Sequence, residues 1–395
     1  MRDEQLSRRL ARVAVLALGL IGLLASRAAA EPYLMVREGA KCSACHTNET
    51  GGGKRTAFAH IHAHDIEHDL ELLPVPPGTK PFNGEVNSYV SIGGDLRVRN
   101  STIFQDKPDA LGRVPENNPF RRGVLSNDST VNEVLGFLQV DLWPDMATFY
   151  LDENLNGGAS TREAFGLLHN FLPHTGVDWF DWLMTDQYIK AGKMFPAFGL
   201  RVHDDEAFIR ARSGFTFQNP DDGGEIGIAP GPFFFASSIT NGKPGDKDVQ
   251  TTFNGYGVFE DIPVVRNVVA GASYARQSNK RDVSGFYAGS NIWKFTYLGE
   301  LDIIDDRTVA TRAMRDKFAA YGEVDLLLLD WLNLRGTFDF VKVTHNNDQT
   351  RYAIGAEPFI SRVIQPRIQY RINNGPGSKP GLNQDELRLE LHFFF

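Results

Sequence analysis

The chain has 395 residues, of which 23% are charged, and its formal net charge of −8 makes nucleic acid an unfavourable partner. No uninterrupted apolar run of helix-spanning length follows residue 30, which excludes an ordinary helical membrane protein. A β-barrel is not excluded, because its strands alternate apolar and polar residues. The length and the lack of a βαβ rhythm favour one large β unit after a short N-terminal module.

Residues 1–30 are typical of a secretory signal peptide. They combine a charged start, an apolar run from Val13 to Ala25 and three small residues, Ala28 to Ala30. The run is shorter than the ~20 residues that a spanning helix needs, so we expect cleavage and not anchoring. Cleavage before Glu31 removes five arginines and two acidic residues, which changes the formal net charge from −8 to −11.

The only two cysteines of the chain lie in the run Lys41-Cys42-Ser43-Ala44-Cys45-His46. This C-x-x-C-H motif predicts one covalent haem c, with thioether bonds from Cys42 and Cys45 and with His46 as an axial ligand of the iron. The alternatives are a periplasmic disulfide, a thioredoxin-like redox pair and half of a zinc site. The redox pair lacks a βαβ context, and the zinc site lacks a second cysteine or histidine pair at set spacing.

The segment after this motif offers candidates for the second iron ligand. Gly51 to Gly53 predict a flexible turn, and 55–68 predicts a helix that places three histidines on one face. That row also fits a solvated helix face or an adventitious metal site. A residue shortly beyond the motif has enough chain to loop over the haem, and methionine is a common axial partner. The candidates, in order, are His60, His64 and Met35, so the expected iron ligands are His46 and His60.

A proline cluster divides the chain. Four prolines between residues 74 and 81 indicate a semi-rigid spacer that ends near residue 82. The predicted organisation is a signal peptide at 1–30, a small, mostly α-helical c-type cytochrome segment with its linker at 31–82, and a β-barrel at 83–395.

Beyond this spacer the sequence alternates with period two. In the stretch 86–99, Ile92, Leu96 and Val98 share one face, whereas Arg97 and Arg99 share the other. Related alternation recurs at 138–142, 322–328 and 364–372. Short turns alternate with long polar connections, as in outer-membrane barrels. We count sixteen antiparallel strands, with 14 or 18 as alternatives.

The last strand has a pattern of its own. Leu387, Leu389, Leu391 and Phe393 face one way with the terminal Phe395, and Arg388, Glu390 and His392 face the other. This aromatic ending resembles the C-terminal signature that the outer-membrane assembly machinery of Gram-negative bacteria reads. The fold class expected is all-β, a transmembrane antiparallel barrel in the lipid of that membrane. The alternative is a globular protein that ends on a hydrophobic edge strand.

In organisation, the mature chain resembles the fused outer-membrane cytochrome-porins, in which a monohaem segment precedes a sixteen-stranded porin. The resemblance rests on Pro32, Arg37, Gly39, the C-x-x-C-H motif and the closing aromatic strand. The phenylalanine and the Gln-Thr pair that the family's iron oxidases show before the motif are absent. The resemblance implies an extracellular electron donor, with Fe(II) as the first candidate, and a periplasmic cytochrome or other electron carrier as acceptor. The corresponding activity is that of an Fe(II):cytochrome c oxidoreductase.

A further segment, 188–215, resembles the porin loop that folds back into the pore. Such a loop would carry a cation-attracting acidic vestibule, or else a solvated acidic surface. The acidic residues concerned are Asp204, Asp205, Glu206, Asp221 and Asp222.

Three functions stay open on the sequence. The first is an electron conduit, because electrons cross a hydrocarbon layer ~30 Å thick only if a redox centre lies in or near it. The second is a solute or ion porin with a haem-containing plug or regulatory segment. The third is a haem-based sensor or scaffold with an open iron site.

Overall fold

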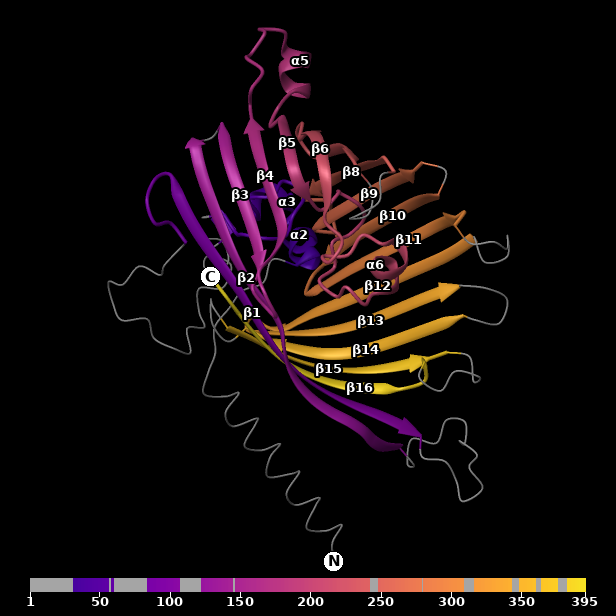
Figure 1. The fold of residues 1–395 in the computed structure, drawn as a ribbon. Coiled ribbons are helices and arrows are strands. Elements are labelled where there is room, and N and C mark those ends of the chain that lie inside the picture. Colours follow the sequence, from indigo (N-terminus) through magenta and orange to yellow (C-terminus); the bar gives the residue numbers. More distant parts are fainter. Residues whose placement is uncertain are drawn as a thin grey trace, which may run out of the picture.

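The computed structural model describes residues 31–56, 58–59, 84–106, 122–144, 146–241, 248–278, 280–308, 316–342, 348–359, 364–375 and 382–395. These residues form a closed antiparallel barrel with short helices inside it and at one rim (Figure 1). The helices include α2 (Pro32–Glu38), α3 (Cys42–Cys45), α5 (Asp178–Leu183) and α6 (Phe208–Ser213). Within the described residues, no helix is long and apolar enough to cross a membrane.

The barrel consists of strands that pair in sequence order. They are β1 (Val90–Asp106), β2 (Arg122–Trp143), β3 (Ala147–Asn154), β4 (Ser160–His169), β5 (Tyr188–Met194), β6 (Asp221–Ile228), β7 (Phe233–Thr240), β8 (Gln250–Glu260), β9 (Asn267–Gln277), β10 (Arg281–Ile292), β11 (Phe295–Asp306), β12 (Asp316–Leu329), β13 (Leu332–Lys342), β14 (Gln349–Pro358), β15 (Ile364–Asn374) and β16 (Asp385–Phe394). β1 pairs with β16, with Asp95 opposite Phe394, and this closes the ring. The predicted count of sixteen strands is confirmed.

The two faces of the wall differ in polarity, as period two requires. Ile239, Phe286 and Ile354 are examples of large apolar side chains exposed on the outside. Inward-facing polar side chains, such as those of Lys190 and Asp325, are fully buried. An apolar outer face and a polar interior are the arrangement that a hydrocarbon layer selects in a barrel.

The connections at the two rims differ in length. At the rim where β2 ends, the connections 144–146 and 330–331 are short, as predicted, and 229–232 and 293–294 are short as well. The exception is 170–187, which carries α5 and projects beyond the strands (Figure 1). The opposite rim carries long connections such as 195–220 between β5 and β6. At 277–283, where the sequence predicts another long connection, β9 and β10 are joined by the short turn 278–280 instead.

Two segments enter the barrel, and Figure 1 shows α2, α3 and α6 inside the ring of strands. Helix α2 lies against β9, β10 and β11, and α6 lies against β11, β12 and β13. One hydrophobic cluster joins Tyr33 and Val36 of α2 to Leu200 and Ile209 of the connection 195–220. The protein therefore builds a core inside its own barrel.

The stretch after the cysteine motif is a turn, as the glycines predict. Gly51, Gly52 and Gly53 have φ of +88°, +81° and +68°. The predicted helix does not begin at Arg55, because Arg55 forms a backbone bridge with His46. Most of the remaining helix, and the proline spacer with the boundary near residue 82, lie outside the described residues.

Candidate functional site

The cysteine motif lies inside the barrel at the end of a tight connection. Helix α2 ends at Gly39, whose φ is +68° and whose N–H caps the carbonyl oxygen of Met35. A β-carbon at Gly39 would lie 2.7 Å from the side chain of Glu260 on the wall. Helix α3 then presents Cys42 and Cys45. Both of them and His46 line one cavity inside the barrel.

The two thiols are free in the structure. Cys42 Sγ lies 3.9 Å from Met35 Sδ, and its backbone N–H points to the Tyr256 hydroxyl at 3.4 Å. Burial raises the pKa of both thiols, that of Cys45 to about 11. A thioredoxin-like pair works with a lowered thiol pKa, so this environment does not favour the redox-pair alternative.

His46 has the properties of an axial ligand. Its backbone N–H donates to the Cys42 carbonyl at 3.0 Å, which fixes the residue directly after the helical turn. Its Nδ1 is buried and has no hydrogen-bond partner among the described residues. Burial first, and then the charges of Arg55 and Arg201, lower the pKa of His46 to about 3. A neutral imidazole and two free thiols on one cavity fit a covalent haem c.

One end of the N-terminal segment is fixed by ion pairs. Glu31 Oε2 lies 2.7 Å from Arg335 Nη2 of β13, and Glu31 also pairs with Arg367 of β15. Burial works to raise the pKa of Glu31, but the two guanidinium groups outweigh it and hold that pKa well below its usual range. The start of the segment is thus anchored to the wall by charge.

The other end of the segment 31–56 is fixed mainly by hydrogen bonds, and fewer charged groups take part in them. Asn48 is fully buried, and its Nδ2 donates to Glu163 Oε1 at 2.9 Å. Asn48 Oδ1 accepts from Lys190 Nζ at 3.1 Å. The Lys54 N–H donates to the Tyr150 hydroxyl at 2.9 Å. The segment 31–56 therefore contacts strands on widely separated parts of the ring.

The candidates for a second iron ligand divide into two groups. Met35 lines the same cavity as the cysteines, whereas His60 and His64 lie outside the described residues. Two further histidines line the cavity. His203 Nδ1 lies 3.0 Å from Arg97 Nη1, and His392 Nε2 lies 2.8 Å from Asp95 Oδ2. Within the described part of the chain, no group of three His, Cys, Asp or Glu side chains forms a metal site.

These two histidines were not among the sequence candidates. The alternation of the last strand places His392 on the inner face, but it does not say which part of the lumen it faces. His203 belongs to a connection whose path through the barrel depends on packing. A sequence signal for either histidine would need contacts between residues far apart in the chain.

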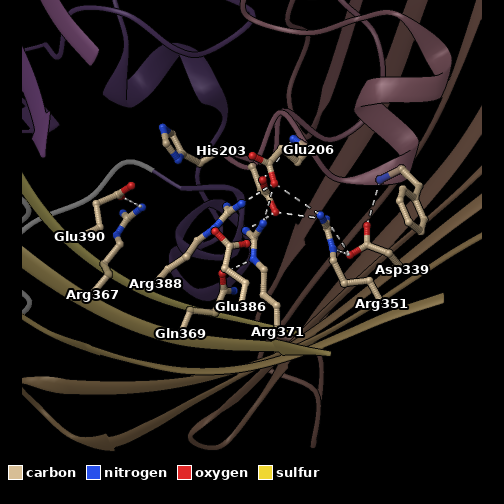
Figure 2. Close-up of polar contacts among 12 residues, drawn as sticks. His203, Glu206, Asp339, Arg351, Arg367, Gln369, Arg371, Glu386, Arg388 and Glu390 are labelled. Carbon is tan, nitrogen blue, oxygen red and sulfur yellow. Dashed lines mark hydrogen bonds and ion pairs between the residues drawn. The ribbon is translucent and has the colours of Figure 1, made fainter. Parts of the chain in front are cut away.

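The acidic tip of the connection 195–220 faces an arginine row on the wall (Figure 2). Asp204 Oδ2 lies 2.6 Å from Arg371 Nη2 and 3.2 Å from Arg351 Nη2. Glu206 Oε2 lies 2.9 Å from Arg371 Nη1 and 2.5 Å from Arg388 Nη2. The predicted cation-attracting vestibule is therefore corrected, because arginines of β14, β15 and β16 balance these two carboxylates.

The other three acidic residues lie apart from this row. Asp205 accepts the N–H of Phe217 at 3.0 Å and lies 3.6 Å from Arg210 Nη2 of α6. Asp221 and Asp222 begin strand β6. The five carboxylates of the expected vestibule therefore do not act as one acidic surface.

Comparisons with known proteins agree on the barrel. No protein-family model matches the sequence, and no curated protein matches it. The fold is similar to that of the outer-membrane expressed OmpT of Vibrio cholerae, with a TM-score of 0.50 and 11% identity over 79% of this chain and 99% of that chain. It is also similar to an anion-selective porin from Comamonas acidovorans, with a TM-score of 0.51 and 10% identity over 78% of this chain and 99% of that chain. At identities this low, the similarity shows only that the folds are alike.

The architecture decides the location. A closed barrel of sixteen strands, apolar outside and polar inside, is a porin-like barrel of the Gram-negative outer membrane, as the sequence predicted. A short helical segment with the cysteine motif lies within it.

Proposed function

We propose that this protein transfers electrons across the outer membrane with one c-type haem held inside the barrel. One observation carries the proposal. Two free thiols and a buried histidine nitrogen without a partner in the described chain converge on a single cavity, between strands that cross the membrane. A haem bound there would supply a one-electron redox centre within a layer that is ~30 Å thick.

The residues of the chain have separate tasks in this proposal. Cys42 and Cys45 bind the group covalently, and His46 holds the iron on one side. Met35, His203 and His392 line the cavity, while the predicted ligands His60 and His64 follow the motif in the chain. Each is a candidate for the other side of the iron. Leu200, His203 and Phe217 of the connection 195–220 also line the cavity and limit the access of water.

The family resemblance supplies the donor and the acceptor of this proposal. An extracellular reductant, with Fe(II) as the first candidate, supplies the electron, and a periplasmic cytochrome or other carrier receives it. The protein tunes the reduction potential through the axial ligand and the polarity of the cavity. The family resemblance supports this direction of flow.

A second candidate is a porin with a haem-bearing plug. The similarity of the fold to OmpT and to an anion-selective porin favours it. The segment 31–56 would then control solute flow, and the haem would act as a structural or regulatory part. Ion current separates the two candidates, because a lumen closed by the segment conducts little.

The test starts with haem attachment. The protein is produced in a host with working cytochrome maturation, and a haem-stained denaturing gel should show one band at the mature mass.

His174→Ala is the matched control for His46→Ala, because the His174 side chain is 93% exposed on the connection 170–187. Intact cells with wild type or His174→Ala should oxidise a donor that cannot cross the membrane, and cells with His46→Ala should not. Equal rates in all three would rule out the conduit, and a large wild-type current in planar bilayers would favour the porin.

A further inference from the structure

The cavity around the cysteine motif is lined by several arginines, and most of those on the wall have acidic partners. Arg97 lies 3.0 Å from Asp95, Arg162 lies 2.6 Å from Glu133, and Arg367 pairs with Glu31. Arg37, Arg55 and Arg201 also line the cavity, but none of them has an ion pair within the described residues. Among the described residues that line the cavity, arginines therefore outnumber carboxylates.

Arg55 lies directly beside the motif. Its backbone pairs with that of His46, and its guanidinium carbon lies 3.9 Å from the centre of the Phe394 ring. The face of an aromatic ring stabilises a cation only weakly. Burial lowers the pKa of Arg55 to about 10, although the carboxylate of Asp95, which is paired with Arg97, acts in the opposite direction.

Arg201 approaches the same histidine from the connection 195–220. Its Nη1 donates to the Gly51 carbonyl at 2.5 Å, and its Nη2 donates to the Phe195 carbonyl at 2.6 Å. These acceptors orient the guanidinium but carry no net charge. Gly51 belongs to the turn between His46 and Arg55, and both arginines line the same cavity. The two arginines therefore flank the same part of the cavity.

We propose that Arg55 and Arg201 form a carboxylate-binding pair that holds the two acidic side groups of a haem attached at Cys42 and Cys45. A planar guanidinium binds a carboxylate through paired N–H donors, and a buried cation is stabilised by a fixed anion. This inference rests on the proposed function. The same chemistry would also bind a free anion such as phosphate, so the experiment has one arm for each source.

Arg37 provides a matched control within the cavity. Its Nη2 donates to Asn333 Oδ1 at 3.3 Å, and its guanidinium lies over the Tyr33 ring with a 5.1 Å separation from the ring centre. It belongs to the last turn of α2, outside the turn that joins His46 to Arg55. Arg37→Gln removes the same charge from the same cavity without touching the proposed pair.

The first arm measures the reduction potential of the haem-loaded protein between pH 5 and 8. Arg55→Gln and Arg201→Gln should lower the potential at pH 8, because a lost positive charge near the iron favours the oxidised form. They should also introduce a pH dependence, since a carboxylate without its guanidinium takes up a proton more readily. Arg55→Lys and Arg201→Lys should retain most of the wild-type behaviour, and Arg37→Gln should be unchanged. Unchanged potentials in both Gln variants, or an equal shift in Arg37→Gln, would overturn the proposal.

The second arm measures thermal unfolding with inorganic phosphate. The Cys42→Ser/Cys45→Ser protein cannot attach haem, so phosphate should raise its midpoint, and adding Arg55→Gln or Arg201→Gln should abolish the effect. The haem-loaded wild type should not respond, because its carboxylates already occupy the pair. A response of the loaded protein would assign the pair to a free anion and overturn the haem assignment. Should no haem attach at all, the proposed function fails by the stained gel, while the phosphate response still decides whether the pair binds anions.

Discussion

The two segments inside the barrel each bring a partly buried carboxylate to the wall, and the two carboxylates behave in opposite ways. Burial raises the pKa of Glu49 in the N-terminal segment to about 7. Burial also acts on Asp204 in the connection 195–220, but Arg371, Arg351 and Arg388 outweigh it and hold that pKa well below its usual range. The difference lies in the number of cations that stabilise each carboxylate.

The surroundings of Glu49 explain its state. Lys190 is the cation that acts most strongly on it, but Lys190 Nζ already lies 2.7 Å from Glu225 Oε1. Glu49 Oε1 lies 3.3 Å from His169 Nδ1. Asp204, by contrast, contacts two arginines at once. Each of them also has another acidic partner, Asp339 at 3.0 Å for Arg351 and Glu206 at 2.9 Å for Arg371. We infer that packing and hydrogen bonds hold the N-terminal segment near Glu49, whereas ion pairs hold the tip of 195–220.

Removing the first of these segments should have the largest effect. Deletion of residues 31–56 takes away the side chains that fill the lumen beside α6, so ion current in planar bilayers should rise from near background to that of an open channel. The deleted protein should still migrate faster unheated than boiled, which shows that the barrel has formed. A heat-modifiable barrel with no added current would mean that 195–220 alone closes the lumen.

Removing the charge of Asp204 in the connection 195–220 should have the second-largest effect. Asp204→Asn removes the carboxylate that Arg351 and Arg371 share, although Asp339 and Glu206 remain beside them, and we expect a loss of about 2 kcal/mol in the free energy of unfolding. Asp222→Asn is the control, because that side chain is exposed at the start of β6, and it should cost less than ~0.5 kcal/mol. Urea titration followed by tryptophan fluorescence measures both. Equal effects would show that the arginine row does not depend on Asp204.

The ion pairs of Asp204 contribute to the free energy of unfolding over a defined pH range. Because the folded pKa of Asp204 is depressed, its contribution is fully present above the ordinary value of 3.8 and is lost as the pH falls through the folded pKa. The difference between wild type and Asp204→Asn should therefore stay constant from pH 8 to about 5 and shrink only under stronger acid.

The sequence predicts the barrel far better than the contents of its lumen. Alternation along β1 and β16 identifies the inward residues Arg97 and His392, because lipid and lumen alternate with every residue. It cannot predict that Asp204 meets Arg351 and Arg371, which lie 147 and 167 residues further along the chain. It also does not predict the long connection 170–187, because a rim loop in water carries no periodic constraint.

The candidate site divides in the same way. The chemistry of Cys42, Cys45 and His46 follows from their spacing alone, and haem attachment stays a prediction that the stained gel tests. Their seat in the barrel depends on contacts with Tyr256 and Asn267, which no local pattern encodes. Sequence reasoning also did not single out Arg55 and Arg201. An arginine that has no ion pair among the described residues is recognisable only once its neighbours in the fold are known.

Glu49 should make the stability of the protein fall as the pH rises from acid to neutral. Its folded pKa of about 7 lies above the ordinary value of 4.5, so the folded state binds more protons between these values and stability falls as the pH rises through this window. Glu49→Gln mimics the protonated form. At pH 8 the variant should be more stable than the wild type by about 2 kcal/mol, and at pH 4 the two should match. Parallel pH profiles in urea titrations would show that Glu49 is ionised without cost.

The smallest expected effect compares two tyrosine hydroxyls that face the N-terminal segment. Tyr150 accepts the Lys54 N–H at 2.9 Å, whereas the Tyr256 hydroxyl lies 3.4 Å from the Cys42 nitrogen, which is long for a hydrogen bond. Tyr150→Phe leaves a buried N–H without its acceptor and should cost about 1 kcal/mol in urea titrations. Tyr256→Phe should cost only a few tenths of that. An equal or reversed order would mean that contacts of the ring, and not the hydroxyl at Lys54, hold this end of the segment in the barrel.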